Sequence, residues 1–98
     1  MTFDLLTTGD GTPEVRVTGE LDISNIERLE AAVTPLLESK PERLVVDVSA
    51  LRFADSSAIT LWVRWASQVG ELELRHPPVL LRTVLGKMGL AERLRLSP

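Results

Sequence analysis

Residues 43–58 read RLVVDVSALRFADSSA, and this stretch decides the fold. Leu44 to Val48 is apolar on both faces except at Asp47, a pattern typical of a strand in the interior of a sheet. We expect residues 49–54 to form a short connector. An acid, two hydroxyls and an apolar run from Ala58 to Ala66 follow, which predicts that a helix begins directly after the connector.

The junction between this strand and this helix, Asp55-Ser56-Ser57-Ala58, carries the strongest chemical signal. A hydroxyl at the start of a helix lies beside unpaired backbone N–H groups and the positive end of the helix dipole. These groups make the position favourable for a phosphate. The alternative is purely structural, because Asp and Ser are also the commonest N-cap residues. Taken by itself, the tetrapeptide favours the cap.

Hydrophobic patterning on both sides of this junction predicts the remaining elements. They are strands over residues 2–7, 14–18 and 71–75, helices over 24–40, over 56–69 (ended by Gly70) and from Pro77-Pro78 to Gly89, and a last helical turn over 91–96. Strands that alternate with helices indicate a sheet with parallel neighbours and right-handed crossovers. Because the chain has 98 residues, we expect a single domain over residues 1–98.

Local motifs give more detailed expectations. Ser24 and Glu27 have the spacing of a capping box, which predicts where the first helix begins. In the second helix, Leu61 and Trp65 share the face that we expect to pack on the sheet. The third helix has an expected buried stripe of Leu81, Val84, Leu85 and Met88. The strand over 71–75 has three side chains that we expect to be exposed: Glu71, Glu73 and Arg75.

Composition excludes several classes of protein. The formal net charge is −3 and no basic run occurs, so we expect no nucleic-acid partner. The chain has no cysteine, which excludes disulfides and thiol chemistry. Residues 1–10 lack the pattern of a signal peptide, and no apolar run approaches the ~20 residues that span a bilayer. The sequence therefore predicts a cytoplasmic protein that does not insert into a membrane.

Side chains that could support catalysis are few. His76 is the only histidine, and its position before a proline favours a loop or capping role over that of a base. A hydrolase triad of Ser57, His76 and an acid is the least favoured interpretation. Asp22, Asp47 and Asp55 match a magnesium cluster poorly, and Asp47 is expected to hydrogen-bond neighbouring loop backbone. We therefore expect no enzyme activity, no metal and no cofactor.

Three segments together resemble the STAS domain family, which is named after sulfate transporters and anti-sigma-factor antagonists. Val17 to Asp22 is similar to the strand-to-helix entry of that family. Leu44 to Ser49, followed by Phe53 to Ser57, resembles its central strand and phosphorylation loop. Pro77 to Leu90 resembles its third helix. The resemblance covers nearly the whole chain, and the order and spacing of the three segments make it specific.

The resemblance implies an α/β fold with a mixed central sheet and helices packed mainly on one face. It also implies an anti-sigma factor antagonist, a bacterial regulator that binds an anti-sigma factor and frees a sigma factor. In such antagonists the second serine of the Asp-Ser-Ser motif accepts phosphate from an anti-sigma factor serine kinase, and a phosphoserine phosphatase removes it. That serine is Ser57, with Ser56 as the less favoured acceptor. The implied partner-binding residues are Asp22, Asp55, Ser56, Ser57 and Ala58.

The chain departs from the family pattern in two places, and the second departure favours an alternative function. Ala58 replaces the usual glycine after the serines, and alanine favours helix over a flexible loop. The chain also stops at Pro98, where many relatives continue. In this respect it resembles the small STAS accessory subunits of lipid-transport ABC complexes. There the partner would be the transporter ATPase, and Ser57 would be an interface cap with no phosphate cycle.

Overall fold

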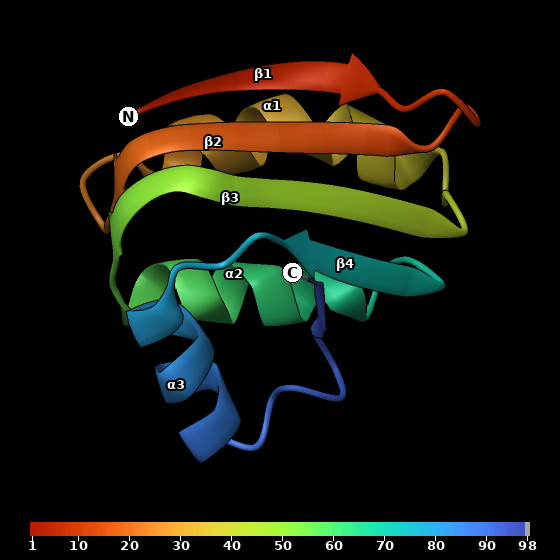
Figure 1. Ribbon diagram of the computed structural model, residues 1–98. Coiled ribbons are helices and arrows are strands. Elements are labelled where there is room, and N and C mark those ends of the chain that lie inside the picture. The colour runs from red at the N-terminus through yellow and green to blue at the C-terminus, as the bar shows by residue number, and fades with distance from the viewer. Residues whose placement is uncertain (98) are drawn as a thin grey trace.

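Strands and helices alternate along the chain, as the sequence predicts (Figure 1). The structure is a computed structural model and describes residues 1–97. In this range the elements are β1 (Thr2–Thr7), β2 (Pro13–Leu21), α1 (Ile26–Glu38), β3 (Arg43–Ala54), α2 (Ser56–Ala66), β4 (Glu71–Arg75), α3 (Val79–Lys87) and β5 (Arg95–Ser97). The strands form a sheet in the order β1-β2-β3-β4-β5, antiparallel between β1 and β2 and parallel elsewhere. The predicted mixed sheet, with the strand that begins at Arg43 at its centre, is confirmed.

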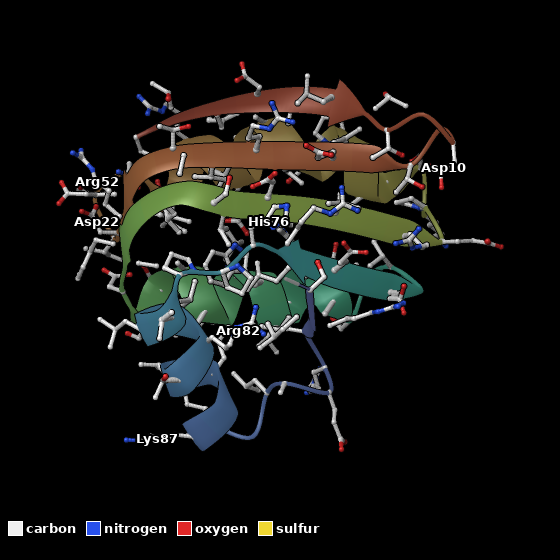
Figure 2. The ribbon with its side chains drawn as sticks, in the orientation of Figure 1. Asp10, Asp22, Arg52, His76, Arg82 and Lys87 are labelled. Atoms are coloured by element: carbon white, nitrogen blue, oxygen red, sulfur yellow. The ribbon has the colours of Figure 1, made fainter. Side chains whose placement is uncertain are left out.

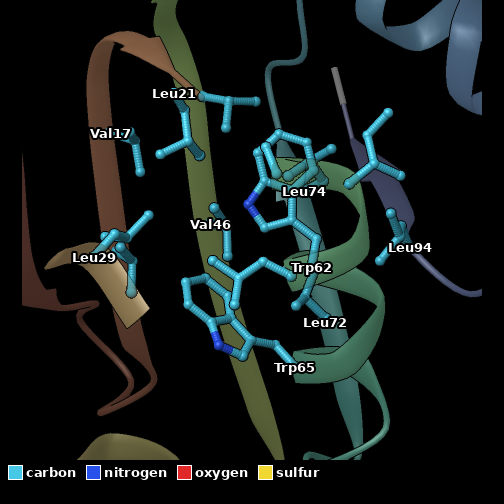
Figure 3. Packing of buried hydrophobic residues seen from close by; sticks show 14 of the residues in the cluster. Val17, Leu21, Leu29, Val46, Trp62, Trp65, Leu72, Leu74 and Leu94 are labelled. Atoms are coloured by element: carbon cyan, nitrogen blue, oxygen red, sulfur yellow. The ribbon is translucent and has the colours of Figure 1, made fainter. Parts of the chain in front are cut away.

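The core lies between one face of the sheet and helices α1 and α2, which Figure 1 shows behind the sheet. Successive strand residues point to opposite faces, so alternate residues enter the core. Those of β2, β3 and β4 include Val15, Val17, Leu44, Val46, Val48, Leu72 and Leu74. Trp62 and Trp65 of α2 pack against these strands, and the Trp65 ring is 1% exposed (Figure 3). Leu61 is also buried, which confirms the predicted packing of α2.

The opposite face of the sheet carries a layer of arginine and carboxylate side chains. Arg43 contacts Glu73 at 2.7 Å and Glu71 at 3.2 Å, and Arg75 contacts Glu73 at 2.8 Å. The prediction that Glu73 is exposed is wrong, because the two arginines cover its carboxylate and leave the residue 7% exposed. Glu71 and Arg75 are half-buried rather than fully exposed for the same reason.

The two central strands are longer than predicted. β2 continues to Leu21, and β3 includes residues 49–54, so the predicted connector is wrong. The cause is parallel pairing between the extended ends of the two strands, which places Leu21 opposite Ala54. Burial of Leu51 adds apolar stabilisation to this extension. The pairing brings the residues that follow each strand to the same end of the sheet.

The predicted capping box of Ser24 and Glu27 is wrong. Helix α1 begins at Ile26, with Asn25 at the N-cap position and no side-chain hydrogen bond from the cap. The hydroxyl and the backbone N–H of Ser24 both donate to the Asp22 carboxylate instead. Ser24 therefore closes a turn in the β2–α1 loop, one residue too early to cap the helix.

Two elements end differently from the sequence prediction. Helix α2 ends at Ala66, so Gly70 does not end it. Glycine is instead needed at position 70 because the backbone passes close to Glu42, and a Cβ there would lie 2.6 Å from the Glu42 carbonyl oxygen. The predicted last helical turn over 91–96 is replaced at its end by β5. Parallel pairing with β4 and burial of Leu94 stabilise this short strand.

Helix α3 touches the core over only part of its length. Of its predicted buried stripe, Leu85 is buried and Leu81 is half-buried, whereas Val84 and Met88 are exposed. In Figure 1 this helix lies below the sheet, near the start of α2 and away from α1. The stripe prediction is wrong at Val84 and Met88 because only one side of α3 meets a neighbour. No helix within residues 1–97 has the length and apolar character needed to cross a membrane.

Candidate functional site

The candidate site lies where the parallel strands β2 and β3 end. The Asp55 N–H donates to the Leu21 carbonyl at 3.2 Å, so the β2–α1 loop and the start of α2 are adjacent. The crevice outside the carboxyl ends of parallel strands is a common place for binding sites in α/β proteins. Figure 2 shows Asp22 and Arg52 at this end of the sheet and Asp10 at the opposite end. The structure thus brings Asp22 together with the Asp55–Ala58 segment.

Asp55 connects the two halves of the site. Its Oδ1 accepts the Ser57 N–H at 3.0 Å, and the Ser57 hydroxyl donates to the same oxygen. Its Oδ2 accepts the Ile23 N–H of the β2–α1 loop at 3.1 Å. Asp55 is therefore the N-cap of α2 and also a link to the neighbouring loop.

Asp22 shapes the β2–α1 loop rather than contacting Asp55 directly. Its Oδ1 accepts the Ser24 N–H at 2.9 Å, and its own N–H donates to the Asn25 side chain at 3.0 Å. The Asn25 amide also donates to the Glu20 carbonyl at 2.9 Å. These bonds fix the loop in one conformation, so the carboxylate of Asp22 has a defined place beside the start of α2.

The three residues after Asp55 differ in accessibility. Ser56 is exposed, Ser57 is half-buried, and Ala58 is fully buried in the first turn of α2. The segment is helical from Ser56 onward, as alanine in place of glycine favours. The Ser57 hydroxyl thus lies beside the N-terminal amides of α2, where partial positive charge favours an anion.

The other candidate residues do not join this site. His76 lies at the end of β4, where its N–H donates to the Ser97 carbonyl at 2.9 Å, and no hydrogen bond joins it to Ser57 in the described part of the chain. Asp47 accepts the Ser49 N–H at 2.9 Å, which confirms its expected bond to neighbouring backbone. Within residues 1–97 no group of three or more His, Cys, Asp or Glu side chains has metal-binding geometry.

Four carboxylates have pKa values below their ordinary values, and hydrogen bonds from Thr8 and Thr12 lower the pKa of the exposed Asp10 to about 2. The hydroxyl of Ser57 is the main cause of the lowered pKa of Asp55, and the Ile23 and Ser57 amides add to it. Burial raises the pKa of Asp47, but the hydrogen bonds from Ser49 and the charges of His76 and Arg16 together outweigh it. Burial likewise raises the pKa of Glu73, but hydrogen bonds from Arg75 and Ser97 outweigh it.

These shifts predict that acid destabilises the fold. Carboxylates with depressed pKa values bind fewer protons in the folded chain than in the unfolded chain. Their contribution to the stability of the fold is therefore complete when the pH is above the ordinary pKa values of 3.8 for Asp and 4.5 for Glu. It is lost as the pH falls through the lower folded values. We expect the free energy of unfolding, measured with urea, to decline below about pH 4.5. The decline should be shallower for Asp47→Asn than for the exposed control Asp4→Asn, and equal slopes would contradict the role of Asp47.

An apolar surface beside the site was not anticipated from the sequence. Ile23, Phe53, Val79 and Leu80 are large apolar residues with exposed side chains. Ile23 and Phe53 follow or end strands at the same edge as Ser57, and Val79 and Leu80 lie in the first turn of α3. The sequence signal was the excess of apolar residues in α3, which we interpreted as a buried stripe.

Solved structures with the same architecture include anti-sigma factor antagonists. One is an antagonist from Mycobacterium paratuberculosis, with 25% identity, a TM-score of 0.87, and coverage of 99% of this chain and 85% of that chain. Another is the Bacillus cell fate determinant SpoIIAA in the phosphorylated form, with 22% identity, a TM-score of 0.77 and coverage of 99% and 92%. The antagonist SpoIIAA in its unphosphorylated form gives 22% identity, a TM-score of 0.82 and coverage of 99% and 89%. At 22% identity, the two SpoIIAA structures show the fold alone.

The sequence comparison gives the family. A family model described as "Mlab, STAS domain" matches residues 5–97, and the chain therefore belongs to the STAS domain family. No curated protein sequence matches the chain at a significant level. The resemblance found in the three sequence segments is thereby confirmed at the level of family and fold.

Proposed function

We propose that this chain is an anti-sigma factor antagonist that acts by partner switching in the bacterial cytoplasm. Its unphosphorylated surface around Asp22, Asp55 and Ser57 binds an anti-sigma factor kinase and frees the sigma factor. The kinase phosphorylates Ser57, the antagonist dissociates, and a phosphoserine phosphatase restores binding. The observation that carries the proposal is the Ser57 hydroxyl at the N-terminus of α2, bonded to Asp55, in a fold shared with antagonists.

A phosphate on Ser57 changes the charge of the site. It adds about −1.5 to −2 charges directly beside the ionised Asp55. The N-terminal amides of α2 stabilise this charge within the free domain. After phosphorylation, a partner surface that fits a neutral hydroxyl meets two neighbouring anions. Repulsion between these anions and the cost of desolvating them both oppose binding.

Asp55 extends the effect of the phosphate to the neighbouring loop. A phosphorylated Ser57 no longer donates a hydroxyl proton to Asp55, and its phosphate competes with that carboxylate for the Ser57 N–H. Repulsion between the phosphate and the Asp55 carboxylate then weakens the hydrogen bond that the Ile23 N–H donates to Asp55. The modification thus alters both the start of α2 and the β2–α1 loop, which together form the proposed partner-binding surface.

Ser57 is a substrate in this scheme and not a catalyst. The kinase supplies the ATP, the metal ion and the group that accepts the hydroxyl proton, so the antagonist is not an enzyme. Ser56 is the less favoured acceptor: it is more exposed, but no hydrogen bond in the described residues ties its hydroxyl to Asp55. To enter a kinase active site, the Ser57 hydroxyl has to leave Asp55.

The second candidate function is that of an accessory subunit held permanently on the ATPase of a lipid-transport ABC complex. One observation favours it: Ala58 is fully buried in the first turn of α2, so the segment after Ser57 is a fixed helix rather than a flexible loop. The Ser57 hydroxyl would then serve only as a cap within a permanent interface.

Calorimetry with two purified partners separates these functions. The chain is titrated into the ADP-bound anti-sigma factor kinase of the same cell and, in parallel, into the ABC transporter ATPase of that cell. We expect binding to the kinase and none to the ATPase. Binding to the ATPase alone would contradict the antagonist function and support the accessory subunit.

A further inference from the structure

A small apolar groove lies between the end of β3 and helix α3. Its walls include Phe53 and Ala54 of β3, Ile59 of α2, and Leu80 and Val84 of α3. The groove encloses about 140 Å³. Binding sites for cofactors and drug-sized ligands enclose about 300–1,000 Å³, so this groove is too small for such a molecule. A cavity of about 150 Å³ holds a benzene-sized group, which is the size of one large apolar side chain.

The rim of the groove is apolar except for the exposed Arg52, and it is open to solvent. Leu80 is 77% exposed and Phe53 is 52% exposed, and Val79 next to Leu80 is also exposed. Contiguous exposed apolar side chains on a small domain mark a surface that another molecule covers. Burial of Leu85 attaches α3 to the core independently of these side chains. Their exposure is therefore not a requirement of the fold.

The groove is continuous with the site around Ser57. Two of its wall residues, Ala54 and Ile59, flank the Asp55–Ala58 segment in the chain. Ile59 lies only two residues after Ser57 on the same helix. A protein that covers the Ser57 hydroxyl therefore extends over the groove as well.

The charges at this edge define a second property of the partner. Asp22 Oδ1 accepts both donors of Ser24, whereas Oδ2 has no donor within the described residues. Asp55 is ionised beside it and belongs to the same loop junction. Arg52, which also lines the groove, is a cation at the same edge, but the two carboxylates outnumber it. An arginine or lysine on the partner therefore complements these two carboxylates.

We propose that the groove receives one leucine, methionine or aromatic side chain of the anti-sigma factor kinase, on a segment that also carries a basic residue facing Asp22. This inference rests on the proposed function and names how the partner binds at the same edge. An apolar side chain that fills a fitted pocket is the typical centre of a protein interface. The groove thus supplies affinity, and the neighbouring Ser57 controls it by charge.

Two variants of the full chain test the groove by calorimetry with the ADP-bound kinase. Leu80→Ser removes apolar rim surface, and Val84→Phe fills the groove from α3 while keeping it apolar. We expect each to weaken binding at least tenfold. Leu6→Ser is the matched control, because Leu6 is an exposed leucine on β1 that pairs with Glu14 at the other end of the sheet. It should bind within twofold of the unmodified chain.

The outcomes distinguish this inference from the function on which it rests. If Leu80→Ser and Val84→Phe both bind within twofold while Ser57→Asp weakens binding, the groove inference is overturned and the proposed function stands. If the unmodified chain does not bind the kinase, both fall. If Leu80→Ser abolishes self-association in sedimentation but leaves kinase binding unchanged, the groove belongs to a contact between two copies and the inference is overturned.

Discussion

Replacing Ser57 by aspartate should weaken binding to the anti-sigma factor kinase by about 100-fold. The new carboxylate lies beside Asp55, which already accepts the backbone N–H of residue 57 and of Ile23. The partner covers this site in the complex. Repulsion between the two carboxylates and the loss of fit to the partner together cost about 3 kcal/mol of binding free energy, which corresponds to more than 100-fold in affinity. Ser57→Ala keeps the site neutral, so it should bind as tightly as the unmodified chain and remain bound when ATP is present.

Calorimetry of four variants and the unmodified chain with the same kinase preparation measures this effect. Ser57→Asn is the neutral match for aspartate, and Ser56→Asp places the same charge on the adjacent, more exposed residue. We expect the aspartate at position 57 to cause the largest loss. Similar affinities for Ser57→Asp and Ser57→Asn would show that charge is not the basis of the switch.

Replacing Trp65 by alanine should cost about 3–5 kcal/mol of unfolding free energy. The ring is 1% exposed and packs between α2 and the core face of the sheet (Figure 3). Removing it takes away buried apolar surface and leaves a cavity that the surrounding side chains fill only in part. Trp65→Phe keeps an aromatic ring and should cost less.

Urea denaturation at neutral pH measures this difference. Arg64→Ala is the control on the same helix, because Arg64 is exposed and its 3.2 Å ion pair with Glu30 lies at the surface. Exposed ion pairs contribute roughly 0–1 kcal/mol, so this variant should be nearly neutral. A cost below about 1 kcal/mol for Trp65→Ala would contradict the packing of α2 on the sheet.

Most of the fold was predictable because its signals are local. The apolar run from Leu44 to Val48 is the centre of β3, and Asp55 with the following serines begins α2. What the sequence could not reveal depends on partners distant in the chain. The pairing of β3 with β2 turned residues 49–54 into strand, and the pairing of β5 with β4 replaced a predicted helical turn.

The placement of the candidate residues at one end of the sheet was predictable, but the hydrogen bonds between them were not. Family resemblance pointed to Asp22, Asp55 and Ser57, and all three lie at the same end of the sheet. The hydrogen bond that the Ile23 N–H donates to Asp55 joins residues 32 positions apart, and no sequence pattern indicates it. The apolar groove escaped notice because Val84 has the spacing of a buried helical residue, whereas its exposure depends on where α3 lies.

The most direct measurement is the mass of the chain after incubation with the anti-sigma factor kinase, ATP and magnesium. Trypsin cleavage after Arg52 and Arg64 releases residues 53–64, a peptide that holds both Ser56 and Ser57. We predict a single added phosphate, located at Ser57 by fragmentation of this peptide, abolished by Ser57→Ala and retained in Ser56→Ala. Phosphate on Ser56 alone would contradict the assignment of the acceptor. No phosphate on either serine would contradict the antagonist function and favour the accessory subunit of an ABC complex.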